Sequence, residues 1–234
     1  MTDRGKEGRI WELDFLRGIA LFLMVYFHIV YDMKEIFDYP VSYETGINSF
    51  TGSAAGSLFI FVSGISSTLS KSNVKRGLRL LGIALAITVA THLYNASFGI
   101  KFGILHFLGI SMLLYKLYGK LNSYFLLVIG TLIIAAGCLI DGIHVSHDYF
   151  FPFGIYTESF VSSDYYPLIP WLGLFIYGVA VGKFLYSTKK RSIFSFSVPD
   201  NIISIAGRNT LLVYLVHQPV IYLLLTAVKY IFRR

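Results

Sequence analysis

Apolar residues run along this chain in long stretches that are separated by short polar connections. Each stretch is about 20 residues long, which is the length that an α-helix needs to cross the hydrocarbon core of a bilayer. The stretches are continuous rather than alternating, which excludes the strands of a membrane β-barrel. The pattern therefore predicts an all-α, polytopic integral membrane protein with about seven transmembrane helices. We place them near residues 13–33, 50–70, 78–97, 102–118, 122–141, 167–186 and 207–230.

The composition agrees with a membrane protein and differs from that of a soluble domain. Of 234 residues, 55% are hydrophobic and 14% are charged, and the mean hydropathy is +0.64. The formal net charge of +7 does not indicate nucleic-acid binding, because basic residues in short loops between apolar spans ordinarily set membrane orientation. Cys138 is the only cysteine, so no intrachain disulfide forms.

The distribution of basic residues predicts a cytoplasmic N-terminus. With this orientation the Lys and Arg residues lie mainly on the inner side, as the positive-inside rule requires. The exceptions are Lys34, Lys101, Lys229, Arg233 and Arg234. The first apolar run is too long for a signal peptide, so it is the first span. We expect a single transmembrane domain over residues 1–234, located in the plasma membrane and closely packed at glycine pairs such as Gly178 and Gly182.

Two charged residues stand at the inner end of the first span. Asp14 and Arg17 are three residues apart, so they share one helix face and form an ion pair easily. The pair is either an anchor for the helix end or part of a substrate site, since arginine can snorkel or bind phosphate. The basic run with Lys75, Arg76 and Arg79 leaves the same choice between topology and a surface for a phosphate-rich ligand.

A histidine lies deeper in the same span. His28 follows Arg17 by eleven residues, which is about 16 Å along a helix, and a polar side chain in the hydrocarbon is costly unless it is paired. Asp32 is one turn further on, so its carboxylate could hold one imidazole nitrogen while the other stays free. This arrangement predicts either a general base or a buried structural His–Asp hydrogen bond.

Other segments bring polar residues to a similar depth or to the outer side. His106 and His217 lie in the fourth and last spans. Asp164 opens the sixth span beside an aromatic cluster, where we expect it to add a second carboxylate to an outer catalytic pocket. Three histidines on three helices suit a metal or a proton path. The metal is the weaker alternative, because no span carries paired ligands at positions i and i+4 of the zinc type.

Five blocks of the sequence, in their order along the chain, resemble segments of a known family. That family comprises the membrane acyltransferases built like the catalytic domain of heparan-α-glucosaminide N-acetyltransferase, and the resemblance covers nearly the whole chain. The blocks are LDFLRGIALFLMVYFH, SLFIFVSGISSTLS, FGILHFLGISML, YYPLIPWLGLFIYGVAVGKFL and GRNTLLVYLVHQPV. The first two blocks are also similar to those of bacterial membrane O-acetylases that modify O-antigen and peptidoglycan.

The resemblance implies transfer of an acetyl or other acyl group from cytoplasmic acyl-CoA to an acceptor, commonly a sugar, at the outer face. Arg17 and His28 reproduce the Arg-then-His spacing of the O-acetylases, which implies that His28 is the base or a transient acyl carrier. Arg17 and the inner basic residues would then meet the phosphates of CoA, and Asn209 and His217 match the late-helix Asn and His of the heparan enzyme. One departure is that the heparan enzyme has asparagine at the position of His28 and its active histidine in the following loop, which has none here.

The leading interpretation is a membrane-embedded acyltransferase, most simply an acetyltransferase, that uses acetyl-CoA as co-substrate and needs no metal. His28 with Asp32 would supply the base, and His106 or His217 would stabilise the oxyanion. The alternative is a proton-coupled transporter or permease in which the buried histidines and carboxylates relay protons; a receptor or scaffold is weaker. The expected partners are the lipid bilayer, acyl-CoA and a sugar or glycan acceptor, and a homodimer is left open.

Overall fold

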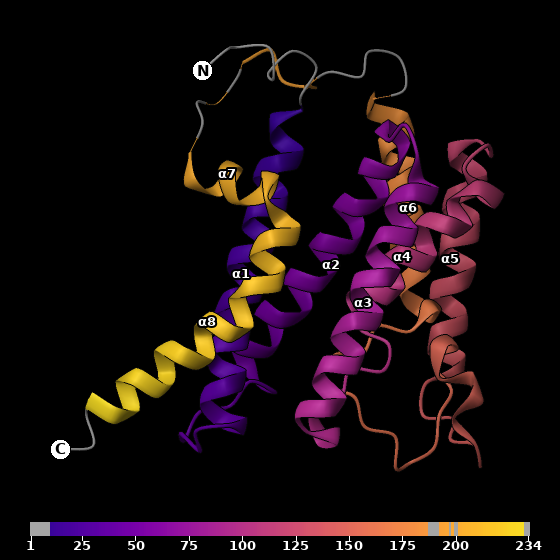
Figure 1. Ribbon diagram of the computed structural model, residues 1–234. Helices are drawn as coiled ribbons and strands as arrows, with labels where there is room; N and C mark the ends of the chain where they lie inside the picture. Colours follow the sequence, from indigo (N-terminus) through magenta and orange to yellow (C-terminus); the bar gives the residue numbers. More distant parts are fainter. Residues whose placement is uncertain (1–9, 187–191, 197, 199–200, 232–234) are drawn as a thin grey trace. The chain divides into compact units, whose positions relative to one another are not determined.

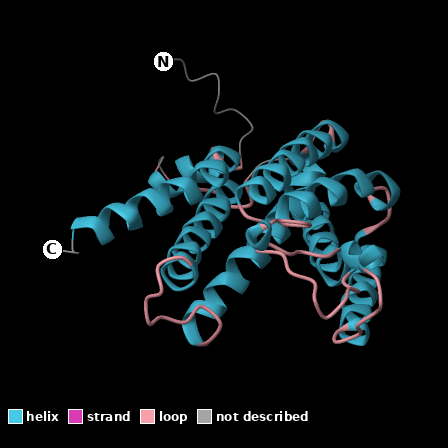
Figure 2. Cartoon of the chain, turned by 60° about the horizontal axis from the view of Figure 1, so that its bottom comes forward, coloured by secondary structure: helices cyan, strands magenta, loops and turns pink. Residues whose placement is uncertain are grey.

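The computed structural model describes residues 10–186, 192–196, 198 and 201–231. Within these residues the chain forms helices joined by loops, without a strand (Figures 1 and 2). The α-helices are α1 (Trp11–Glu35), α2 (Gly46–Leu69), α3 (Asn73–Tyr94), α4 (Ile104–Tyr118), α5 (Ser123–Ile140), α6 (Leu168–Tyr186), α7 (Ile202–Arg208) and α8 (Thr210–Ile231). Two short 3-10 helices, η2 (Ala96–Phe98) and η3 (Asp148–Phe153), lie in the connections. The all-helical prediction is confirmed.

The helices match the predicted membrane spans in position. Six helices among the described residues, α1, α2, α3, α5, α6 and α8, are long and apolar enough to cross a bilayer. The segment predicted at 102–118 is the shorter helix α4, whose 15 residues extend about 22 Å against about 30 Å of hydrocarbon. The chain is therefore a polytopic membrane protein, whose described part has six helices of spanning length and the shorter apolar helix α4.

The contacts divide the chain into two compact units. One comprises Met1–Phe59 and Arg191–Arg234, and the other comprises Ile60–Lys190, so that the division falls within α2. The prediction of one acyltransferase domain over residues 1–234 stays a prediction.

In the first unit, α1 packs against both α7 and α8. The contact of α1 with α7 leaves no room for a side chain at two glycines, because a Cβ at Gly207 would overlap the carbonyl oxygen of Asp14 and a Cβ at Gly18 would overlap that of Ile203. Such glycines let two helix backbones touch. The sequence did not predict α7 as a helix: it has seven residues and precedes the break at Asn209 between α7 and α8.

In the second unit, α3 packs against α4 and α5 against α6. Glycines again mark the close approaches: Gly130 faces Gly173 across α5 and α6, and Gly178 lies against the backbone of Phe61. Gly182 packs against Thr68 and Ile65 of α2. The expected role of Gly178 and Gly182 in close helix packing is confirmed.

The connection between α5 and α6 is itself folded. Thr157 donates its backbone N–H to Asp148, Val145 donates to the carbonyl of Tyr156, and the Tyr165 hydroxyl donates to the carbonyl of Phe151. The backbone hydrogen bond from Thr157 holds the pKa of the half-buried Asp148 carboxyl below its usual range. These bonds give the connection a fixed shape at one end of the second unit.

Candidate active site

Two of the predicted histidines face each other in the first unit. His28 of α1 and His217 of α8 have ring centroids 4.8 Å apart and nearly perpendicular planes. His217 is 8% exposed and His28 is half-buried. The packing of α8 on α1 therefore joins two imidazoles that are 189 positions apart in the sequence.

The hydrogen bonds of these rings indicate which nitrogen carries the proton in the neutral form. The Nδ1 atom of His28 lies 2.9 Å from the carbonyl oxygen of Met24, and Nδ1 of His217 lies 2.6 Å from that of Tyr214. A carbonyl oxygen only accepts hydrogen bonds, so in each neutral ring Nδ1 carries the proton. The Nε2 atom of each ring then holds a lone pair, which is the form that a proton acceptor requires.

The structure corrects the expected partner of His28. The i, i+4 spacing predicts a hydrogen bond between His28 and Asp32, yet Nδ1 of His28 is directed to its own helix and Asp32 Oδ1 accepts a 2.8 Å hydrogen bond from Gln218 Nε2. The prediction is wrong because helical spacing cannot show that α8 places an amide donor beside the carboxylate. The carbonyl of Met24 therefore holds the His28 ring, and the amide of Gln218 binds the Asp32 carboxylate, in place of the predicted hydrogen bond between His28 and Asp32.

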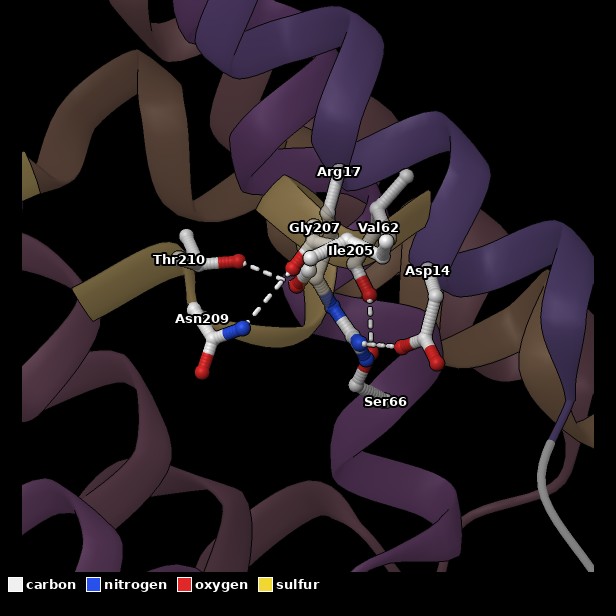
Figure 3. Close-up of polar contacts among 8 residues, drawn as sticks. All are labelled: Asp14, Arg17, Val62, Ser66, Ile205, Gly207, Asn209 and Thr210. Carbon is white, nitrogen blue, oxygen red and sulfur yellow. Dashed lines mark hydrogen bonds and ion pairs between the residues drawn. The ribbon is translucent and has the colours of Figure 1, made fainter. Parts of the chain in front are cut away.

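Asp14 and Arg17 lie at the N-terminal end of α1. The Arg17 guanidinium donates to Asp14 Oδ1 at 2.7 Å, which confirms the predicted ion pair (Figure 3). The last turn of α7 packs on this part of α1 through Gly207. Just beyond it, Asn209 donates its side-chain N–H to the carbonyl of Ile205 at 2.9 Å and so closes the end of α7 (Figure 3).

His106 and Asp164 belong to the second unit, where they organise the start of α4. Asp164 Oδ2 accepts the backbone N–H of Ile104 at 2.9 Å, so it supplies a carboxylate to a helix N-terminus. His106 is buried, and its Nε2 lies 3.3 Å from Thr88 Oγ1. Since the Thr88 hydroxyl already donates to the carbonyl of Ile100, His106 is the donor in this bond. Both side chains bind the protein's own backbone or hydroxyls here.

The basic residues Lys75, Arg76 and Arg79 lie in the first two turns of α3 and are exposed. Ser72 caps this helix by accepting the backbone N–H of Lys75 at 3.3 Å. The N-terminus of a helix carries a partial positive charge, which repels these cations. A bound anion would offset both charges. This placement agrees with either expectation for the run, orientation in the membrane or binding of phosphates.

Among the residues that the structure describes, no three His, Cys, Asp or Glu side chains come together as ligands. His28 and His217 contact each other through their rings, and the nearby Asp32 carboxylate accepts a hydrogen bond from Gln218, the residue after His217.

Tyr43, in the loop after α1, packs its ring on Tyr31 and Phe27. Burial raises the pKa of the Tyr43 hydroxyl to about 12, and the neighbouring Glu35 carboxylate adds to the shift. The hydroxyl thus stays protonated at neutral pH, in an aromatic cluster that Tyr43 forms with Tyr31 and Phe27.

Sequence reasoning missed two groups at the histidine pair, the carbonyl of Met24 and the amide of Gln218. No sequence signal identifies a particular backbone carbonyl as a partner. Gln218, in contrast, follows His217 directly, and a polar pair inside an apolar span is itself a sign of a buried network.

Comparison with known proteins gives one family. The family described as "Heparan-alpha-glucosaminide N-acetyltransferase, catalytic" matches residues 9–219, which cover α1 through the first part of α8 and both units. No curated protein and no solved structure matches the chain. The match extends over most of the chain and includes the histidine pair, and on this ground the protein is a member of the heparan-α-glucosaminide N-acetyltransferase catalytic-domain family of membrane acetyltransferases.

Proposed function

We propose that the protein transfers an acetyl group from acetyl-CoA, or an acyl group from a related acyl-CoA, to a hydroxyl or amino group of a sugar or cell-envelope glycan. The observation that carries this proposal is the pair of His28 and His217, whose Nε2 atoms are free of protons in the neutral rings. An acyl thioester is already activated, so the protein must chiefly remove a proton from the acceptor and hold it in place.

His28 acts as the base in this proposal. Its Nε2 takes the proton of the acceptor as the acceptor oxygen or nitrogen bonds to the thioester carbonyl carbon. The carbon–sulfur bond then breaks, and the CoA thiolate leaves and receives the proton from the imidazolium. The carbonyl of Met24 keeps the ring in place and stabilises the positive charge through the Nδ1–H bond. Attack of His28 Nε2 itself on the thioester, to give an acyl-histidine, uses the same lone pair.

His217 fits a second proton-accepting group better than an oxyanion donor. Its Nδ1–H is directed to the carbonyl of Tyr214, and the neutral ring has no proton on Nε2 to donate to an oxyanion. His106 does not fit the role of oxyanion donor either, because its Nε2–H already donates to the hydroxyl oxygen of Thr88. We propose that His217 exchanges protons with His28, 4.8 Å away between ring centroids.

The donor would bind at the cytoplasmic side. Arg17, supported by Asp14, would compensate phosphates of CoA, since a guanidinium presents five N–H donors in a plane. The basic residues at the start of α3 belong to the second unit, and their binding of phosphates is a separate proposal. Asn209, at the end of α7, lies on the segment that packs beside Asp14. With the N-terminus in the cytoplasm, and the protein in the plasma membrane, the histidine pair lies further toward the outer face than Arg17, as transfer to an outer acceptor requires.

A proton-coupled permease is the second candidate, and the buried His217 and Asp32 with the half-buried His28 are what favour it. Purified protein incubated with radiolabelled acetyl-CoA and cell-envelope glycans separates the two functions. Acetyl transfer to the glycans, or release of CoA, supports the acyltransferase. Absence of both, together with proton-driven uptake in vesicles, supports the permease and contradicts the proposal.

A further inference from the structure

A second polar contact joins α1 to α8 one helical turn beyond the histidine pair. His28 and Asp32 are four residues apart, about 6 Å along the helix, and their partners on α8 are the adjacent residues His217 and Gln218. Counted from Arg17, the contact of Asp32 with Gln218 lies on the far side of the histidines. A group that approaches from the outer side would reach this contact before the histidines.

This second contact is buried and incompletely satisfied. Asp32 is 0% exposed, and its Oδ1 accepts the amide of Gln218. Three other buried atoms, Asp32 Oδ2, Gln218 Oε1 and His217 Nε2, have no hydrogen-bond partner among the described residues. A buried polar atom without a partner costs folding free energy, so three of them on one helix contact indicate a ligand that supplies the missing bonds.

The chemistry of these atoms specifies what such a ligand carries. A carboxylate oxygen and an amide oxygen only accept hydrogen bonds, and Nε2 of His217 is an acceptor in the neutral ring. Acceptors are completed by N–H or O–H donors. An ionised carboxylate or phosphate group of a ligand offers only acceptor oxygens, so it would leave the acceptor atoms of Asp32 and Gln218 without partners.

We propose that Asp32 and Gln218 form an acceptor subsite that binds a hydrogen-bond-donating group, a hydroxyl or an amine, beside the nucleophile of the acceptor. This inference rests on the proposed acyltransferase function and deepens it. Asp32 contacts the acceptor through Oδ2, and Gln218 is a positioning residue that fixes the carboxylate and offers its own oxygen. The subsite selects polyol or amino-bearing acceptors and rejects those with an acidic group next to the nucleophile.

The subsite is tested by Gln218→Leu, which keeps the size of the side chain and removes the hydrogen bond. The probes are methyl glucoside, methyl 2-amino-2-deoxyglucoside and methyl glucuronoside, which distinguish a hydroxyl, an added amine and an added carboxylate. We expect the wild type to use one or both of the first two and to discriminate against the third. Gln218→Leu should raise the acceptor KM about 10- to 100-fold, with the CoA dissociation constant close to wild type. The melting temperature should fall, because the buried Asp32 Oδ1 loses its donor, so the acceptor KM measured on folded protein is the readout for the subsite.

The matched control is Thr226→Val, which also removes a polar group from α8 but whose hydroxyl binds only the carbonyl of Tyr222 on an exposed face; its KM should equal that of the wild type. The double variant Asp32→Asn/Gln218→Glu exchanges carboxylate and amide across the contact, and recovery of KM supports the subsite. An unchanged KM in Gln218→Leu, or equal use of the glucuronoside, overturns it. So does transfer to none of the probes by a wild-type protein that still binds CoA and releases it from acetyl-CoA. A wild type that neither binds nor turns over CoA contradicts the proposed function instead.

Discussion

Gly207→Ala tests how α7 supports the inner end of α1. A Cβ at this position would lie 1.8 Å from the carbonyl oxygen of Asp14, whereas Cβ atoms essentially never approach another heavy atom within 3.0 Å. The helices must therefore separate by about 1.2 Å, the difference of these distances. Overpacking of this kind costs about 1–3 kcal/mol. At about 2–4 °C per kcal/mol for a chain of this size, the melting temperature should fall by about 2–12 °C.

The displaced backbone carries Asp14 and is followed by Arg17, so the variant should also bind CoA more weakly. Melting of the detergent-solubilised protein and calorimetric titration with CoA measure the two effects. The matched control is Gly82→Ala in α3, where a Cβ meets nothing within 4 Å. Replacing a helical glycine by alanine there should leave stability unchanged or raise it by up to about 1 kcal/mol. A Gly207→Ala protein that melts and binds CoA like the wild type would refute the account of the contact between α1 and α7.

Three further predictions concern orientation, donor binding and pH. In a Cys138→Ser background, an impermeant thiol reagent should label Ser72→Cys only from the cytoplasm and Ser146→Cys only from outside; labelling of Ser72→Cys from outside would reverse the topology. Arg17→Ala and the double change Lys75→Ala/Arg76→Ala should each weaken CoA binding in calorimetry, because the phosphates lose compensating cations; unchanged affinity in both would leave these residues with topology alone. Because the pKa of Asp148 is held low, its charge favours the folded state above the unfolded pKa, and this contribution disappears as pH falls through the folded value. The melting temperature of the wild type should thus exceed that of Asp148→Asn at pH 6 and converge with it as the pH falls below about 4; a difference that does not change with pH would contradict this.

Hydropathy predicted the helices well because lipid leaves the backbone few alternatives to a helix, and each predicted span coincides with a helix. It could not predict α7, since a helix of seven residues, separated from α8 by Asn209 alone, carries too short a pattern. Hydropathy also could not predict where α4 begins. An apolar run does not reveal that Asp164, an aspartate 60 residues away, accepts the backbone N–H of Ile104 at the start of this helix.

For the candidate site, spacing along one helix was informative only about that helix. It correctly predicted the ion pair of Asp14 with Arg17, which lies within one turn. It failed for His28 and Asp32, whose partners are a backbone carbonyl and an amide on another helix. The approach of His217 to His28 depends on the packing of α8 against α1, which no local pattern contains.

The central claim, that His28 is the proton acceptor of acyl transfer, is tested most directly by the turnover of His28→Ala. The matched control is His92→Ala, because His92 binds the carbonyl of Thr88 four residues earlier just as His28 binds that of Met24, but belongs to α3. The account predicts that His28→Ala lowers the rate of acetyl transfer about 10²- to 10⁴-fold, with CoA affinity and melting temperature close to wild type, while His92→Ala keeps its turnover. Wild-type turnover in His28→Ala with a lower melting temperature would show that the histidine only stabilises the helices, and would contradict the claim.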